Sequence, residues 1–408
     1  MTYKYITPLS VALFFGCPPA ADSAAGTCDG FVGVPSMAYD VDLVELPGRT
    51  WSTDRGPLYS LGGPGEELHR VSTALFQSDG RVVVANEGGH ELLLFDKAGQ
   101  LISRTGREGG GPGEFRQLMS LSVGTADSLF TYDGRQRRLS VFDGEGVFAR
   151  DVTLRGLDTL GVTQHVGVLQ TGEIVVAFHR RSEGIGLSRD SILVTLFDPS
   201  GKPAVSLGMF PHMYTHWGPH SIPGGPGQAA FPLPVAFSSV TAVSQGDSSI
   251  YVGLPDQQAL IHLDLSGNRH VTCWQGSQQA VTEVHRERLF AWLATALRMP
   301  QEELDIVRNV EGLATLPAFG FEPLTAKVGQ QALLVTDVDG VWLQPFQLPD
   351  DSTAVPWPRF DAAGSYEGTV TLPPRFRATD VRGDVVIGVY RDTTDVEYVR
   401  AYRLVVDR

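Results

Sequence analysis

Three histidines lie close together near the middle of the chain and are the residues best suited to chemistry. His212, His216 and His220 follow one another at intervals of four residues. Imidazole nitrogen is a common ligand of zinc and other divalent metals. On a helix this spacing would align the three rings, but Gly218-Pro219 argues against a regular helix. The segment therefore predicts either a metal site, for zinc or calcium, or a polar, aromatic loop that binds ligand by stacking and hydrogen bonding.

Other patterns of catalytic residues are missing from the sequence. It contains no Gly-x-Ser-x-Gly, no His-Glu-x-x-His and no Cys-x-x-Cys. Residues 106–115 are rich in glycine, but they lack the Gly-Lys-Ser/Thr ending of a phosphate loop, and no helix is predicted after them. The sequence therefore gives no catalytic residue, and the glycine-rich stretch is interpreted as a structural turn.

The first residues have the pattern of an export signal. Lys4 is followed by the largely apolar residues 6–15. A membrane-spanning helix needs about 20 apolar residues, whereas a run this short suits the core of a signal peptide. Cys17, after Phe14-Phe15-Gly16, resembles the lipid-modified cysteine of bacterial lipoproteins. The alternative is ordinary signal peptidase cleavage after Ser23-Ala24-Ala25.

These features predict how the chain is organised before its main domain. We expect a signal peptide of the lipoprotein type over residues 1–17 and a flexible tether over residues 18–42. The protein would then lie in the cell envelope, in the periplasm or on the outer surface, and contact the membrane only through its lipid. Secretion is the alternative. Besides Cys17, only Cys28 and Cys273 occur, and they form either a disulfide or two unpaired thiols with Cys273 buried in a strand.

Two short units recur along the rest of the chain and predict its fold. In the first, a polar turn precedes a β-rich run; the runs begin at Val82, Leu129, Ile174, Ile250, Val341 and Val385. In the second, a strand ends at an aspartate and a glycine follows three residues later; the aspartates are Asp96, Asp143, Asp198, Asp264 and Asp361, and a sixth copy at 401–404 is degenerate. Aspartate and glycine at these positions are typical of capped turns between antiparallel strands.

Six such units favour an all-β fold over residues 43–408, a six-bladed β-propeller with four-stranded antiparallel blades. One small sheet cannot bury both of its faces, but sheets stacked around an axis can. The last unit is one strand short, and residues 58–61 are predicted to complete it and close the ring. An amphipathic helix over residues 280–298, followed by a second short turn over 301–310, forms an insertion at about 279–312. The helix is either a packing cap or a lid or partner-docking helix.

Residues 106–115 resemble the blade-linking motif of bacterial six-bladed propellers related to NHL repeats. Residues 316–319, 391–397 and 399–404 are similar to the same group, whose members are mostly exported and have no shared activity. The resemblance covers about residues 43–408 and implies the fold. Some six-bladed relatives are calcium-dependent lactonases and others are lyases that use zinc and calcium, but their signature stretches do not occur here.

Charge and composition limit the possible partners. The net charge is −14, from 32 basic and 46 acidic residues, and such a field repels a nucleic-acid backbone. Nucleic-acid binding is therefore not expected. The repeats, the tether and the missing motifs favour a non-enzymatic binding or scaffolding module for a small molecule or an envelope protein. The alternative is a metal-dependent hydrolase or lyase whose site lies at the mouth of the propeller channel.

Overall fold

The computed structural model describes residues 36–39, 43, 46–63, 67–221, 228–276, 279–310, 312–320, 332–335, 340–351 and 353–407. The predicted signal peptide, Cys17 and Cys28 lie outside these residues. Among the helices described, none is long and apolar enough to cross a membrane.

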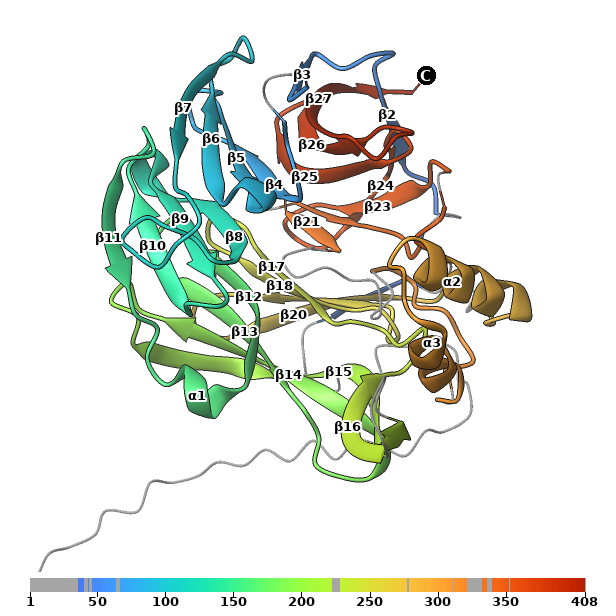
Figure 1. Ribbon diagram of the computed structural model, residues 1–408. Coiled ribbons are helices and arrows are strands. Elements are labelled where there is room, and N and C mark those ends of the chain that lie inside the picture. Colours follow the sequence, from blue (N-terminus) through green and yellow to red (C-terminus); the bar gives the residue numbers. More distant parts are fainter. Residues whose placement is uncertain are drawn as a thin grey trace, which may run out of the picture.

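The strands form six blades, numbered in chain order, around a central axis (Figure 1); blades 5 and 6 belong to one nine-stranded sheet, and each of the others is a sheet of its own. Blade 1 contains β4 (Val71–Phe76), β5 (Val82–Asn86), β6 (Glu91–Phe95) and β7 (Leu101–Thr105). Blade 2 contains β8 (Leu118–Val123), β9 (Leu129–Asp133), β10 (Arg138–Phe142) and β11 (Phe148–Val152). Blade 3 contains β12 (Val162–Val168), β13 (Ile174–Arg180), β14 (Gly186–Phe197), β15 (Pro203–Ser221) and β16 (Gln228–Pro234).

The remaining blades include strands from the N-terminal side. Blade 4 contains β17 (Ala242–Gln245), β18 (Ile250–Leu254), β19 (Ala259–Leu263) and β20 (Arg269–Trp274), with β1 (Ser36–Tyr39) added in parallel. Blade 5 contains β21 (Leu333–Val335), β22 (Val341–Leu343), β23 (Pro356–Phe360) and β24 (Tyr366–Thr371). Blade 6 contains β25 (Phe376–Arg382), β26 (Val385–Arg391), β27 (Glu397–Val406) and β3 (Tyr59–Leu61). The fold is the predicted six-bladed propeller.

The hydrophobic core is divided among the contacts between blades. Each of six apolar clusters joins two consecutive blades, including blades 6 and 1. The second strand of three blades is buried along its whole length, namely β5, β18 and β22, because side chains on both of its faces meet a neighbouring blade. Stacking around the axis therefore buries what a single sheet would leave exposed.

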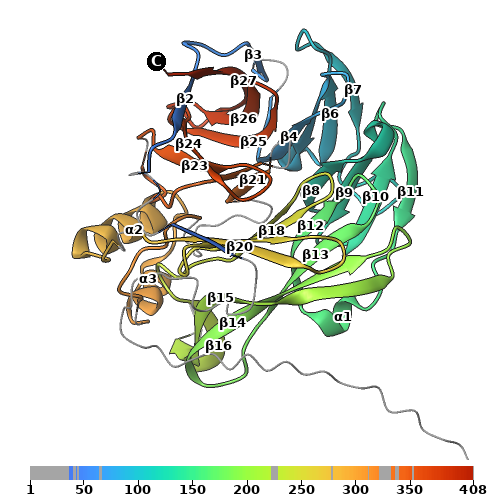
Figure 2. The same cartoon turned by 180° about the vertical axis from the view of Figure 1, so that it is seen from behind.

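The ring is closed as the sequence predicts. β3 pairs antiparallel with β27, with Leu61 opposite Val399, and supplies the fourth strand of blade 6. The sequence did not indicate β2 (Arg49–Thr53), which pairs with both β24 and β27 and so joins blades 5 and 6 into one continuous sheet. Figure 2 shows these N-terminal strands beside the C-terminal end of the chain.

The insertion between blades 4 and 5 is helical, as predicted. α2 (Glu283–Thr295) begins at Thr282, whose side chain forms a capping box with His285. α3 (Gln301–Arg308) follows, and Leu289, Leu293 and Leu304 pack with Phe237 in a separate apolar cluster. The short helix α1 (Leu157–Leu160) lies between blades 2 and 3.

Blade 3 departs most from the regular pattern. Its strands β14 and β15 have 12 and 19 residues and extend as a long antiparallel arm that also carries β16. The prediction of a loop around the three histidines is therefore wrong. His212, His216 and His220 lie on β15, because pairing with β14 and β16 continues to the end of the strand in spite of Gly218-Pro219.

Candidate functional site

A cavity of about 540 Å³ lies at the centre of the ring. The first strands of all six blades line it, together with the turns that lead into several second strands. We call the end formed by these turns the mouth. The volume falls within the roughly 300–1,000 Å³ typical of small-molecule sites.

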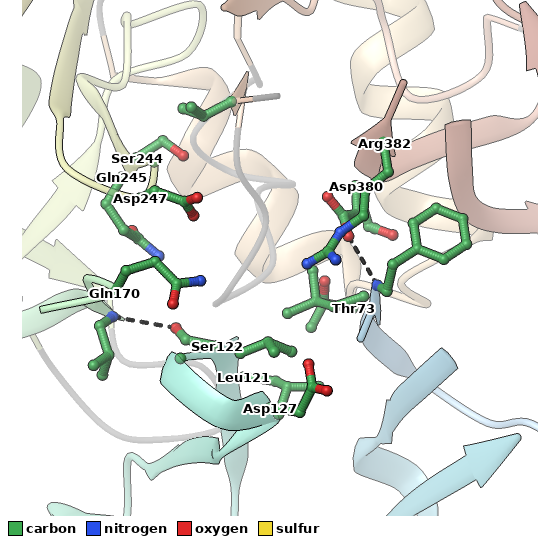
Figure 3. A pocket seen from close by; sticks show the side chains of 18 of the residues that line it. Thr73, Leu121, Ser122, Asp127, Gln170, Ser244, Gln245, Asp247, Asp380 and Arg382 are labelled. Atoms are coloured by element: carbon green, nitrogen blue, oxygen red, sulfur yellow. Dashed lines mark hydrogen bonds between the residues drawn. The ribbon is translucent and has the colours of Figure 1, made fainter. Parts of the chain in front are cut away.

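The wall of the cavity is mainly polar on the sides shown in Figure 3. Ser244, Gln245, Asp247 and Gln170 lie on one side, from blades 4 and 3, and Arg382 and Asp380 lie across from them with Thr73. A third wall comes from blade 2; its labelled residues are Leu121, Ser122 and Asp127.

Two of the three labelled carboxylates hold neighbouring blades together. Asp127 accepts hydrogen bonds from the backbone nitrogen and the hydroxyl of Ser78, each at 2.6 Å, and so links blade 2 to blade 1. Asp380 accepts from the backbone nitrogen of Phe76 at 2.8 Å and so links blade 6 to blade 1. These two acids therefore have a structural task. Asp247 lies in the turn between β17 and β18.

The amide of Gln245 is fixed by a buried histidine behind the wall. His165 Nε2 lies 2.6 Å from Gln245 Oε1. Burial lowers the pKa of His165 to about 4, although the bond to Gln245 opposes this. The imidazole is therefore neutral near pH 7, and its Nε2–H donates to the amide oxygen. Gln245 also covers Gly167, where a Cβ would lie 2.1 Å from the amide, so the side chain is held in one place.

Arg382 has the least satisfied charge in the cavity wall. Its Nε is buried, and no residue in the described part of the chain forms a hydrogen bond or ion pair with its guanidinium. By contrast, the buried Arg377, also in the wall, donates to the carbonyl of Val71 at 2.9 Å. A guanidinium without a partner favours an anionic ligand group.

The three histidines proposed as metal ligands are spread along one strand, β15. An extended strand rises about 3.3 Å per residue, so a spacing of four separates neighbouring histidines on β15 by about 13 Å. Within the described ranges, no group of three His, Cys, Asp or Glu side chains lies close enough to hold a metal ion. Zinc or calcium binding at this segment stays a prediction from the sequence.

His212 instead joins a buried cluster inside blade 3. Its ring packs against His179, with centroids 5.0 Å apart, and His179 Nε2 lies 2.7 Å from Asp190 Oδ2. Burial opposes ionisation of Asp190, but hydrogen bonds from His179, Ser182 and Thr215 outweigh it and lower the pKa of the carboxyl. Burial lowers the pKa of His212 to about 3, and the neighbouring His179 adds to this effect. The cluster is closed to solvent.

A smaller cavity of about 170 Å³ lies between blade 4 and the helical insertion. Asp256, Ser239 and Phe346 line it. Asp256 already forms an ion pair with Arg189, which also donates to the carbonyl of His212. This cavity is less suited to a ligand than the central one because its charge is already neutralised.

The state of Cys273 is also established. This cysteine, on β20, is disulfide-bonded, so the alternative of two unpaired thiols is wrong. Its partner lies outside the described residues.

Comparisons with known proteins agree on the fold. The family model described as "6-bladed beta-propeller" matches residues 67–157. Among curated proteins, none matches the sequence.

Several solved structures are similar in fold. A duf4221 family member from Bacteroides vulgatus is 7% identical, covers 86% of this chain and 98% of its own, and has a TM-score of 0.47. A virginiamycin B lyase from Staphylococcus aureus is 9% identical, covers 82% and 97%, and has a TM-score of 0.38. A gluconolactonase from Xanthomonas campestris is 10% identical, covers 88% and 99%, and also has a TM-score of 0.38. Likeness at this level concerns the fold and not the activity.

Proposed function

We propose that this propeller is an exported protein of the cell envelope that binds a small polar molecule in its central cavity without carrying out a reaction on it. The observation that supports this most is the cavity itself, a volume of about 540 Å³ to which all six blades contribute. Its polar groups come from several blades and so have fixed positions relative to one another. Preorganised polar groups in a concave site are typical of ligand binding.

Export is supported by two independent features. The N-terminal sequence has the pattern of a signal peptide with Cys17 at a lipoprotein-like position. Cys273 is disulfide-bonded, and structural disulfides are typical of oxidising compartments outside the cytoplasm.

A ligand screen with a matched pair of variants tests the proposal. Thr73 points into the cavity, so Thr73→Trp should fill it, whereas Thr50→Trp places the same side chain at an exposed position of β2. We expect polar small molecules that raise the melting temperature of the wild type to lose this effect in T73W and keep it in T50W. Ligands that stabilise all three proteins equally would contradict binding in the cavity.

The enzymatic alternative is a metal-dependent hydrolase or lyase at the mouth of the channel. Its best support is the presence of carboxylates from three blades there, Asp127, Asp247 and Asp380. Against it, Asp127 and Asp380 are already bonded to backbone groups of blade 1. Elemental mass spectrometry on untagged protein separates the two functions, because zinc or calcium retained in stoichiometric amount after dialysis would favour the enzyme.

A further inference from the structure

The guanidinium of Arg382 forms no ion pair within the described part of the chain. Arg382 is the last residue of β25 and is half-buried, and its Nε is shielded from solvent without a hydrogen-bond acceptor. A charged donor that is removed from water without a partner costs free energy, and a bound acceptor recovers part of it. The planar group can donate two parallel N–H bonds to a carboxylate. Arg382 therefore indicates an anionic group at one end of the ligand.

The other charged residues on the same strand already have partners. Asp380 accepts from two backbone N–H groups, one at each carboxylate oxygen and both at 2.8 Å. Arg377 donates to a backbone carbonyl of blade 1 at 2.9 Å, and the negative charge of Glu397 acts on it. Arg382 differs from Arg377 in that no described group offsets its charge, so a ligand is the group that can do so.

The walls across from Arg382 offer neutral hydrogen-bond donors (Figure 3). The amide oxygen of Gln245 accepts from His165 at 2.6 Å, so its NH₂ group, for which the described residues provide no acceptor, is left to donate to a ligand. The hydroxyl of Ser122 accepts from a backbone nitrogen at 3.3 Å and keeps its hydrogen to donate. The Gln170 side chain both donates and accepts. These groups suit the hydroxyl or carbonyl oxygens of a ligand.

The acids of the cavity limit the charge that a ligand can carry. Asp127, Asp247 and Asp380 line it, and the net charge of −14 adds to their field. A phosphate group, with close to two negative charges at pH 7, is repelled about twice as strongly as a carboxylate. A neutral molecule or a cation would leave Arg382 without a counter-ion. One carboxylate on an otherwise neutral, polar molecule therefore fits best.

We propose that the central cavity binds a small monocarboxylic acid that also carries neutral hydroxyl or carbonyl oxygens. Its carboxylate accepts hydrogen bonds from Arg382, and its neutral oxygens accept from Gln245 and Ser122. Residues of blades 6, 4 and 2 then contact one molecule, and the closed ring fixes their positions relative to one another. This inference rests on the proposed function, since it names the ligand class of the same cavity.

The test uses isothermal titration calorimetry with the full mature protein and a panel of hydroxy and oxo monocarboxylic acids, each paired with its own primary amide. We expect members of the panel to bind, and each amide to bind about tenfold or more weakly than its acid, as for loss of a charge-assisted bond. Inorganic phosphate should not displace a bound acid. If no acid binds, if the amides bind as well as the acids, or if phosphate displaces them, the inference is overturned.

Variants then assign the carboxylate to its residue. Arg382→Gln should weaken the acid about tenfold but leave its amide almost unchanged, and an equal effect on both would contradict the contact. Arg135→Gln, at an exposed turn of blade 2, is the matched control and should change neither. A neutral polar molecule that binds the wild type and not T73W, in the absence of any bound acid, would leave the proposed function standing while this inference fails. An acid that binds T73W as well as the wild type would count against both.

Discussion

His212 shows how a buried polar side chain can make stability depend on pH. Its ring is only 1% exposed. Its Nδ1 lies 3.2 Å from the backbone nitrogen of Thr241 and therefore accepts that hydrogen bond. The single proton of the neutral ring must then sit on Nε2, which has no hydrogen-bond partner among the described residues. A second proton would break the Thr241 bond and place a charge beside His179 and Arg189.

We expect the protein to lose stability on acidification through this residue. The folded pKa of His212 is about 3 and the unfolded value is about 6.5, so between these values the unfolded chain binds more protons. The free energy of unfolding should therefore fall by about 1.4 kcal/mol for each pH unit below 6.5. His212→Asn keeps an acceptor for Thr241 and should remove this contribution.

Urea denaturation at pH 7.5, 6.0 and 5.0 measures this difference. The exposed His69, replaced by Asn, is the control and should retain the full slope. If the free energy of unfolding falls equally with pH in the wild type and in H212N, the His212 imidazole takes up a proton in the folded protein as readily as in the unfolded chain.

The aspartate turns were predictable residue by residue. Asp96 Oδ1 accepts from the backbone nitrogens of Ala98 and Gln100 at 2.9 and 2.8 Å, and Asp264 does the same for Ser266 and Asn268 at 2.9 and 2.8 Å. The following glycine has a positive φ, as at Gly267 with 84°. These contacts are local, so the sequence contains all of their determinants.

Arg382 and Asp247 were missed as site residues because only the closed ring brings them to one cavity.

Among the secondary-structure elements, the N-terminal strands show the limits of pattern reading. β3 was predicted because residues 58–66 repeat the end of blade 1, and α2 was predicted from its apolar spacing. β1 and β2 were not predicted, because neither belongs to a repeat and each adds to a sheet edge formed far along the chain. A strand that belongs to a repeat could therefore be predicted, whereas strand propensity alone did not reveal β1 and β2.

One buried acid contributes strongly to the contact between the last and first blades. Glu397, only 6% exposed, opens β27. Its Oε2 accepts from the backbone nitrogen of Val71 at 2.7 Å, and its Oε1 accepts from Arg391 at 2.5 Å. Burial lowers the pKa of the nearby Arg377 to about 10, and the charge of Glu397 opposes that shift. This carboxylate therefore holds the closure together by both hydrogen bonds and charge.

Glu397→Gln should destabilise the propeller by about 2–3 kcal/mol, because it removes the charge that compensates Arg377 and one of the two acidic partners of Arg391. Urea midpoints measure the effect. The control is Glu367→Gln, which breaks a more exposed pair with Arg359 inside blade 5 and should cost less than about 1 kcal/mol. Equal losses in the two variants would mean that the closure has no special dependence on Glu397.

For the molecule as a whole, the cysteines connect the fold to its location. Cys273 is disulfide-bonded, and within the chain only Cys17 and Cys28 can be its partner. Ala38 on β1 is paired with Cys273 itself, so residues 36–39 lie beside the strand that holds Cys273. Lipidation would occupy the thiol of Cys17, and signal peptidase cleavage near Ala25 would remove that residue. Both export routes therefore leave Cys28.

We accordingly expect peptide mapping without reducing agent to find a Cys28–Cys273 disulfide in protein from the envelope fraction. Cys28→Ser should free the Cys273 thiol and lower the free energy of unfolding by about 2–4 kcal/mol. Labelled palmitate then separates the routes, because lipidation predicts incorporation into the wild type and none into Cys17→Ser. A Cys17–Cys273 peptide would contradict both routes at once, since it requires a chain that has kept its signal segment and carries no lipid.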